Sequence, residues 1–213
     1  MRAILASRNS ILRLSQYKNA LYRFEKLGYV KVFSDILADA IGVTPAQVRK
    51  DFSLFGIKGN KRGGYSVEEL VGKLNEILGK NKIQGVIIAG AGKIGTALMR
   101  YKGFENEGIK ILAAFDIDPA KVRETGDIPV YPMDTLKNFV KQSNIKVGII
   151  AVPDIAAQQV FETMMSAGIR GILNFAPIHI LETSDVVVNN INVGLELENV
   201  IYFVNALDRT KGK

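Results

Sequence analysis

The sequence has 213 residues, of which 47% are hydrophobic and none is cysteine. This hydrophobic fraction is sufficient for a folded core, and the lack of cysteine excludes disulfide scaffolds and thiolate metal sites. No apolar run approaches the roughly 18 residues of a membrane span, and no apolar core of signal length follows Met1. We therefore expect a cytoplasmic protein without a membrane partner.

The positive charge is confined to one part of the chain. Residues 1–80 hold 14 Lys and Arg against 7 Asp and Glu, whereas residues 81–213 hold 14 of each kind. The first part therefore carries the whole formal net charge of +7. A basic module of this size favours a polyanion as its partner, and we expect it to form a separate domain over residues 1–80.

A helix with one apolar face is predicted over residues 11–27. Its apolar residues recur every three or four positions, which places them on one side of a helix. They are Leu14, Tyr17, Leu21, Phe24 and Leu27. The basic residues Arg13, Lys18 and Arg23 fall outside this stripe, so we expect them at the surface.

Two shorter helices follow and form a helix-turn-helix. Ser34 is expected to cap the first of them, which covers residues 35–41. Thr44 is expected to cap the second, because Pro45 is preset for the first position of a helix. This second helix ends at Gly56.

A glycine-rich basic hairpin covers residues 56–65, and Ser66 then caps a fourth helix. Elements of these kinds in this order predict a winged helix that binds double-stranded DNA. The second helix of the turn would enter the major groove, and the hairpin would lie on phosphates. An ordinary solvated surface is the alternative explanation of the basic residues. The residues expected to contact DNA are Gln47, Arg49, Lys50, Ser53, Lys58, Lys61 and Arg62.

An apolar run over residues 84–90 is typical of a strand in a parallel sheet that is covered on both faces. It leads into a glycine-rich turn and then into a helix predicted from Thr96 to Tyr101. The turn consists of Gly90, Ala91, Gly92, Lys93, Ile94 and Gly95. Gly90 permits the tight turn, Gly92 lets the backbone approach a pyrophosphate, and Gly95 allows the helix to pack closely on the strand. The pattern therefore favours a dinucleotide site, with phosphates at the helix N-terminus.

A second strand over residues 110–115 ends in Asp116, which lies 21 residues beyond Gly95. A carboxylate at this distance can accept both hydroxyls of an adenosine ribose. The two residues after it offer no base for a 2′-phosphate, so NAD(H) is favoured over NADP(H). The alternative is that Asp116 caps the loop before Pro119.

Further strand–helix units complete a domain over residues 81–192. Val152 and Pro153 follow one predicted strand, and Phe175 and Pro177 follow another. Ligands in open α/β sheets lie at these carboxyl ends, so all four residues are candidates for contact with the cofactor. The expected fold class is therefore α/β, with a winged helix followed by a Rossmann-like doubly wound parallel sheet.

The tail, residues 193–213, contains a helix that is apolar on more than one side. Its principal face holds Leu197, Val200, Ile201, Val204 and Leu207, while Tyr202 and Phe203 point elsewhere. One surface of the same chain cannot cover such a helix. We expect it either to fill a groove in its own chain or to insert into a partner subunit, and we favour a homodimer.

Taken together, these motifs resemble the Rex-type redox-sensing transcriptional repressors over nearly the whole chain. The resemblance rests on the segments 47–56, 61–65, 90–95, 101–104, 115–119, 151–153 and 171–177. It implies a homodimer on palindromic operator DNA, with NAD(H) in the second domain and a swapped C-terminal helix. It also implies that NADH disfavours the arrangement that binds DNA, whereas NAD⁺ permits it.

Two positions depart from the family pattern. An arginine of the family's first helix falls at Asn19, and an aspartate before the terminal helix falls at Asn192. In the family these two, with the tyrosine that aligns with Tyr101, form a redox-dependent linkage between subunits. A neutral hydrogen bond is roughly half as strong as a charge-assisted one. We therefore expect weaker discrimination between NADH and NAD⁺.

Two other functions compete with this interpretation. An NAD-dependent dehydrogenase would need an acid–base residue, and the only histidine, His179, is more simply a surface or packing residue. A DNA-binding regulator could instead sense coenzyme A or another adenine nucleotide, because the glycine turn does not distinguish these ligands. We predict no catalytic residue and no metal site.

Overall fold

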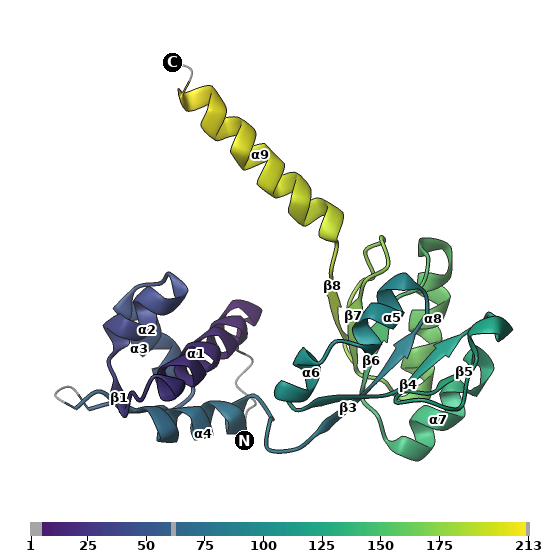
Figure 1. Ribbon diagram of the computed structural model, residues 1–213, viewed down its shortest axis with the longest axis horizontal. Helices are drawn as coiled ribbons and strands as arrows, with labels where there is room; N and C mark the ends of the chain where they lie inside the picture. The colour runs from purple at the N-terminus through teal and green to yellow at the C-terminus, as the bar shows by residue number, and fades with distance from the viewer. Residues whose placement is uncertain (1–5, 61–62, 212–213) are drawn as a thin grey trace. The chain divides into compact units, whose positions relative to one another are not determined.

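A computed structural model describes residues 6–60 and 63–211. The chain divides into two compact units, Met1–Lys82 and Ile83–Lys213 (Figure 1). We call them the N-terminal and the C-terminal unit, and each is described by itself.

Over residues 6–60 and 63–82, the N-terminal unit combines four helices with a two-stranded antiparallel sheet. The helices are α1 (Arg8–Lys26), α2 (Ser34–Ile41), α3 (Pro45–Leu54) and α4 (Val67–Ile77), and the strands are β1 (Lys31–Val32) and β2 (Tyr65–Ser66). The apolar stripe of α1 packs into a single core with the inner faces of the other helices. The rings of Tyr17 and Phe52 meet edge to face there, 5.2 Å apart. This arrangement confirms the winged-helix prediction.

Two of the predicted helix caps are confirmed and one is wrong. The Thr44 hydroxyl accepts a hydrogen bond from the Gln47 N–H at 3.2 Å, and Ser66 accepts one from Glu69 at 3.4 Å. Ser34, by contrast, is the first helical residue of α2, and Phe33 occupies the cap position without a side-chain bond. The Ser34 hydroxyl therefore remains available for a contact with another helix.

The expected exposure of Lys18 is also wrong, since this side chain is only 1% exposed. Its ammonium lies 5.6 Å from the centre of the Tyr22 ring. Burial, and then the neighbouring Lys18 ammonium, lower the pKa of Lys80 to about 8. Leu27, which was assigned to the apolar stripe, is instead 72% exposed, because α1 ends one residue before it.

The C-terminal unit is built on a six-stranded sheet in which every pair of neighbours is parallel. Its strands are β3 (Gln84–Ala89), β4 (Ile109–Asp116), β5 (Val130–Pro132), β6 (Val147–Ile150), β7 (Gly171–Asn174) and β8 (Val187–Asn190). They lie in the order β5-β4-β3-β6-β7-β8. The order reverses between β3 and β6, which is where a doubly wound sheet opens a crevice for a ligand. The predicted fold class is thus confirmed.

Helices cover both faces of this sheet. The helices α7 (Leu136–Ser143) and α8 (Asp154–Ala167) pack on one face, and α5 (Lys93–Met99) and α6 (Gly103–Asn106) pack on the other. The helix after the glycine turn therefore begins three residues earlier than the predicted Thr96. It also ends before Tyr101, so this tyrosine lies outside it.

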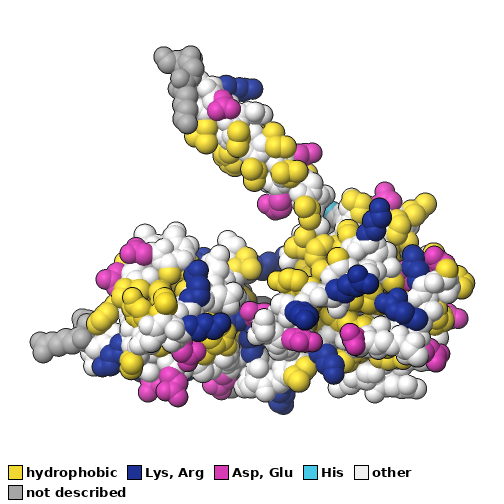
Figure 2. All heavy atoms as spheres, viewed as in Figure 1, with side chains coloured by type: hydrophobic (Ala, Val, Ile, Leu, Met, Phe, Trp, Pro, Cys, Tyr) yellow, Lys and Arg dark blue, Asp and Glu magenta, His cyan; other side chains and the backbone are white. Residues whose placement is uncertain are grey.

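A long final helix, α9 (Val193–Lys211), carries a row of exposed apolar side chains (Figure 2). Their exposed fractions run from 51 to 69%. They are Val193, Leu195, Leu197, Val200, Ile201, Tyr202, Phe203, Val204 and Leu207. Among the residues that the structure describes, no helix has both the length and the apolar character of a membrane span.

Candidate functional site

The glycine turn lies at the carboxyl end of β3, beside the point where the strand order reverses. Gly90 adopts a φ of +99°, and a Cβ there would overlap the Ala151 carbonyl at the end of β6. A Cβ at Gly95 would overlap the carbonyl of Gly90, so α5 packs directly on the turn. At Gly92 nothing lies within 4 Å of an added Cβ. Two of these glycines thus serve the fold, whereas Gly92 leaves open space for a ligand.

Asp116 holds this turn in place. The carboxylate is 6% exposed and accepts hydrogen bonds from the Ala91 N–H at 2.7 Å and the Asp118 N–H at 2.9 Å. The Lys121 ammonium lies 3.2 and 3.4 Å from its two oxygens. Burial alone would raise the pKa of Asp116, but these hydrogen bonds and the Lys121 charge outweigh burial and lower it. The carboxylate is therefore ionised, and both of its oxygens accept hydrogen bonds.

Sequence analysis missed Lys121. It lies in a short 3₁₀ turn, Pro119–Lys121, and its ammonium also lies 3.8 Å from the Asp118 carboxylate. The prediction that no basic side chain lies near the ribose end of the site was based only on the two residues after Asp116. A lysine five residues further on was within reach, because the 3₁₀ turn folds it back.

The other predicted cofactor residues gather beside the turn. The Ala151 N–H donates to the Ala89 carbonyl at 2.8 Å, which brings the segment with Val152 and Pro153 against the end of β3. The Phe175 N–H donates to the Ile150 carbonyl at 2.8 Å and ties the end of β7 to β6. Val152 and Phe175 are half-buried, whereas Pro153 and Pro177 are exposed, as are Lys93 and Ile94 on α5.

Asn174, which sequence analysis did not single out, organises the loop after β7. This buried amide accepts the Ala176 N–H at 2.9 Å and donates to the Ile178 carbonyl at 2.8 Å. It also donates to the side chain of Asn190 on β8 at 2.9 Å. The only feature of the sequence that indicated this role is the presence of a polar residue in an otherwise apolar strand.

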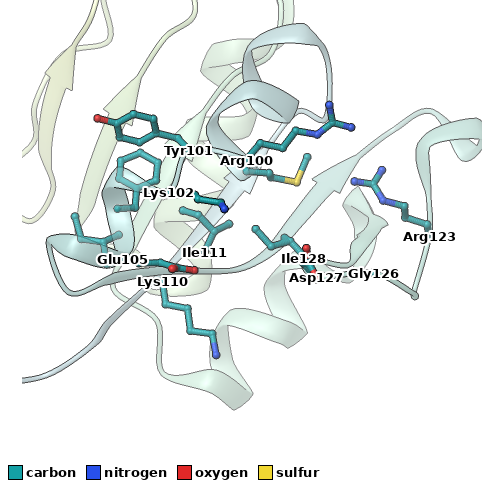
Figure 3. Close-up of a pocket in the computed structure, with 13 residues that line it drawn as sticks. Arg100, Tyr101, Lys102, Glu105, Lys110, Ile111, Arg123, Gly126, Asp127 and Ile128 are labelled. Atoms are coloured by element: carbon teal, nitrogen blue, oxygen red, sulfur yellow. The ribbon is translucent and has the colours of Figure 1, made fainter.

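Tyr101 is the one predicted cofactor residue that lies away from the turn. It follows the C-terminal end of α5, and a helix of seven residues is about 10 Å long. The side chain is 60% exposed, and its ring meets Phe104 edge to face at 5.0 Å. Both rings border a pocket of about 420 Å³ on the α5–α6 side of β4 (Figure 3).

The predicted DNA-binding residues divide into three groups. Lys50, Ser53 and Lys58 are exposed. Arg49 is also exposed, and its guanidinium donates to the Ser34 hydroxyl at 3.1 Å, which ties α3 to the start of α2. Lys61 and Arg62 lie outside the described residues.

Gln47 belongs instead to a polar cluster in which Tyr17 and Asp51 are buried and Gln47 and Arg13 are half-buried. Its amide donates to Asp51 at 2.8 Å, and Asp51 is 2% exposed. Arg13 from α1 binds the same carboxylate with two hydrogen bonds of 2.6 and 2.7 Å, and the Tyr17 hydroxyl donates at 3.0 Å. We call Arg13, Tyr17, Gln47 and Asp51 the α1–α3 clamp, because it fixes α3 against α1.

Burial and the hydrogen bonds within the clamp shift the pKa values of Asp51 and Tyr17. Burial would raise the pKa of Asp51, but hydrogen bonds from Arg13, Gln47 and Tyr17 outweigh it and lower the pKa below its ordinary value. The pKa of Tyr17 is raised, first by burial and then by its bond to Asp51. Asp51 depends on this bidentate partner, because its carboxylate is buried and would be an uncompensated charge without Arg13, whose own side chain is 22% exposed.

The two residues that depart from the family pattern lie in different units. Asn19 is exposed on α1. Asn192 accepts a hydrogen bond from the Leu195 N–H at 3.2 Å and so caps the first turn of α9. His179 is exposed in the segment between β7 and β8.

Comparison with known proteins places these sites in a family. The family described as "CoA binding domain" matches residues 81–178, and "Putative DNA-binding protein N-terminus" matches residues 7–53. The "Redox-sensing transcriptional repressor Rex" of Desulforamulus reducens is 39% identical over 199 residues, which cover 93% of this chain and 95% of that protein. The chain belongs to the Rex family of redox-sensing transcriptional repressors.

Other Rex proteins support the same assignment. The Rex of Pelotomaculum thermopropionicum is 38% identical over 93% of both chains. Among solved structures, the Rex-family repressor RSP in complex with β-NAD⁺ and operator DNA has a TM-score of 0.91 at 33% identity. The match covers 98% of this chain and 96% of that one. The RSP complex with β-NADH has a TM-score of 0.86 at 33% identity and covers 98% of both chains. The likeness to Rex proteins therefore includes both units and α9.

Proposed function

We propose that this protein is a transcriptional repressor that binds palindromic operator DNA and releases it in response to the ratio of NADH to NAD⁺. The observation that carries the proposal is the full-length match to a Rex-family repressor solved with both NAD⁺ and operator DNA. The glycine turn at the β3–β6 crevice and the exposed basic residues of α3 support it from this chain's own residues. Because its target would be chromosomal DNA, the protein would act in the cytoplasm.

In this proposal α3 is the recognition helix. Lys50 and Ser53 are exposed on it and are positioned for base edges or phosphates. Arg49 is held by Ser34, and its remaining N–H groups can still donate to DNA. Gln47 donates one amide N–H to Asp51, and its second N–H and its carbonyl oxygen can still contact DNA.

The dinucleotide would lie across the β3–β6 crevice with its pyrophosphate at Gly92. The exposed positions of the turn leave room for it, and Val152 and Phe175 supply apolar contacts. We propose that Asp116 acts chiefly by fixing the turn. A ribose hydroxyl would reach its carboxylate by displacing the Lys121 ammonium, which can also approach a 2′-phosphate.

We propose that α9 joins two subunits, because the described part of its own chain leaves its apolar side chains exposed. Removal of residues 195–213 is expected to yield a monomer with poor affinity for operator DNA, since a single subunit reads only half of a palindrome. Analytical ultracentrifugation of the truncated and full-length proteins measures this directly. A truncated chain that remains dimeric would contradict the role given to α9.

The redox response is expected to be smaller than in a Rex protein with the charged pair. A ligand shifts a conformational equilibrium only by its differential affinity for the two states. With Asn19 and Asn192, the charge-dependent part of that difference is missing, and Asn192 already bonds to the backbone of α9. The nicotinamide contacts and Tyr101 would supply the remaining difference in affinity between the two states.

The decisive experiment uses the full-length protein and a duplex selected from a random library. Its fluorescence anisotropy is measured with increasing NADH, NAD⁺, NADPH or coenzyme A. We expect NADH to release the DNA modestly better than NAD⁺, and coenzyme A to have no effect. Release by coenzyme A alone would instead establish the competing function, a regulator that senses a different adenine nucleotide.

A further inference from the structure

The connection between β4 and β5 leaves part of the sheet without a covering helix. Residues 117–129 form only the 3₁₀ turn and an isolated pairing of Arg123 with Val130. The crossings from β3 to β4 and from β6 to β7 each carry a helix. The pocket beside Tyr101 lies over this uncovered part of the sheet. Its volume of about 420 Å³ falls in the range of small-molecule sites.

The floor of the pocket is apolar and its rim is cationic. Met99, Ile111 and Ile128 lie at the floor, next to the ring of Phe104. In Figure 3 the guanidinium groups of Arg100 and Arg123 extend toward one another on one side of the pocket, whereas Lys110 points away.

The cations at the rim are free to bind an anion. Across residues 6–60 and 63–211, no ion pair or hydrogen bond engages the side chain of Arg100, Lys102 or Arg123. The carboxylates of Glu105 and Asp127 also line the pocket, but neither is paired with these cations. Arginine is suited to bidentate binding of phosphate, and two arginines that converge from separate segments form a clamp for one such group.

We propose that this pocket is a second ligand site for a phosphorylated small molecule of mononucleotide size. Its phosphates would lie between Arg100 and Arg123, and its aromatic base would lie on Ile111 and Ile128. The site is separate from the glycine turn, because α5 lies between them and only its opposite end borders the pocket. An occupant would contact Tyr101 and, if the proposed function holds, would act on a side chain to which the proposed redox response also assigns a role.

Isothermal titration calorimetry of the full-length protein with ADP, saturated beforehand with NADH, tests this proposal. ADP is expected to bind, and the double change Arg100→Ala with Arg123→Ala should weaken it at least tenfold. Lys110→Ala is the matched control, because this lysine lines the same pocket but points away from it, and it should leave ADP affinity within twofold. Both arginines are exposed, so equal thermal unfolding of the variants shows that they fold.

Further measurements separate this site from its alternatives. ADP binding should survive Gly92→Val, which removes the proposed dinucleotide contact, so failure of one site does not imply failure of the other. The proposal is overturned if ADP does not bind at millimolar concentration, or if only Gly92→Val abolishes its binding. It is also overturned if pyrophosphate binds as tightly as ADP, since the apolar floor would then contribute nothing. Conversion of the double variant to a monomer would show that a second copy occupies the pocket, and would likewise overturn it.

Discussion

Replacing Gly92 with valine is expected to abolish NADH binding while the protein remains folded. The space around an added Cβ is empty, and the φ of −73° at Gly92 lies outside the left-handed region that favours glycine. The branched side chain would occupy the place of the pyrophosphate. We expect affinity to fall by roughly 100-fold or more, which corresponds to about 3 kcal/mol. Titration of NADH fluorescence measures the effect.

Two other glycines serve as controls for this prediction. Gly72→Val on α4 also enters open space, so it should affect neither folding nor NADH binding. Gly95→Ala should instead destabilise the C-terminal unit, because its Cβ would overlap the Gly90 carbonyl. Unchanged NADH affinity in the Gly92 variant would place the dinucleotide elsewhere.

Replacing Asp51 with alanine is expected to unfold the N-terminal unit under conditions in which the C-terminal unit stays folded. The change leaves the Arg13 guanidinium without its carboxylate and removes the partner of Tyr17 and Gln47. The Tyr17 hydroxyl is buried, and leaving a buried donor without its acceptor costs about 1–3 kcal/mol. Hydrogen–deuterium exchange should therefore show loss of protection in α1 and α3 but not in β3 or β6, and operator binding should be lost.

Matched variants separate the clamp from a general effect of charge. Asp39→Ala removes an exposed carboxylate from α2 and should change stability by less than about 0.5 kcal/mol. The double change Arg13→Met with Asp51→Leu should cost less than Arg13→Met alone, since the buried Asp51 charge is then not left without its arginine. Additive costs for the two single changes would show that these residues do not act together.

A low pH should remove the stability that the α1–α3 clamp contributes. The pKa of Asp51 lies below its ordinary value of 3.8 in the folded protein. The stability that this carboxylate contributes is therefore fully present above pH 3.8 and is lost as the pH falls through the lower, folded-state pKa.

Features that depend on neighbouring residues could be predicted from the sequence. The cap at Thr44 and the glycine turn are of this kind, because a hydroxyl before Pro45 or a run of glycines has few alternative structures. Apolar runs and turns likewise predicted β3, β4, β6 and β7, whereas β5, α7 and β8 were not predicted. Local patterns were thus sufficient for the α/β fold and for the position of the crevice.

Features that depend on distant residues could not be predicted in this way. The clamp joins Arg13 to a carboxylate 38 residues away, and Asp116 reaches back 25 residues to Ala91. Lys18 was misplaced for the same reason, since a helical pattern shows which face is apolar but not what covers its edge. One feature of the sequence did indicate the clamp, since Asp51 falls beside Val48 and Phe52 on the core face of α3.

The apolar surface of α9 has a genetic consequence. In the proposed assembly each repressor contains two chains, and each chain contributes one recognition helix. A subunit that keeps α9 but has a defective α3 would enter mixed dimers and withdraw intact chains from their operators. Such an allele would be dominant over the wild type. An allele that lacks α9 would be recessive, because its product could not join an intact chain.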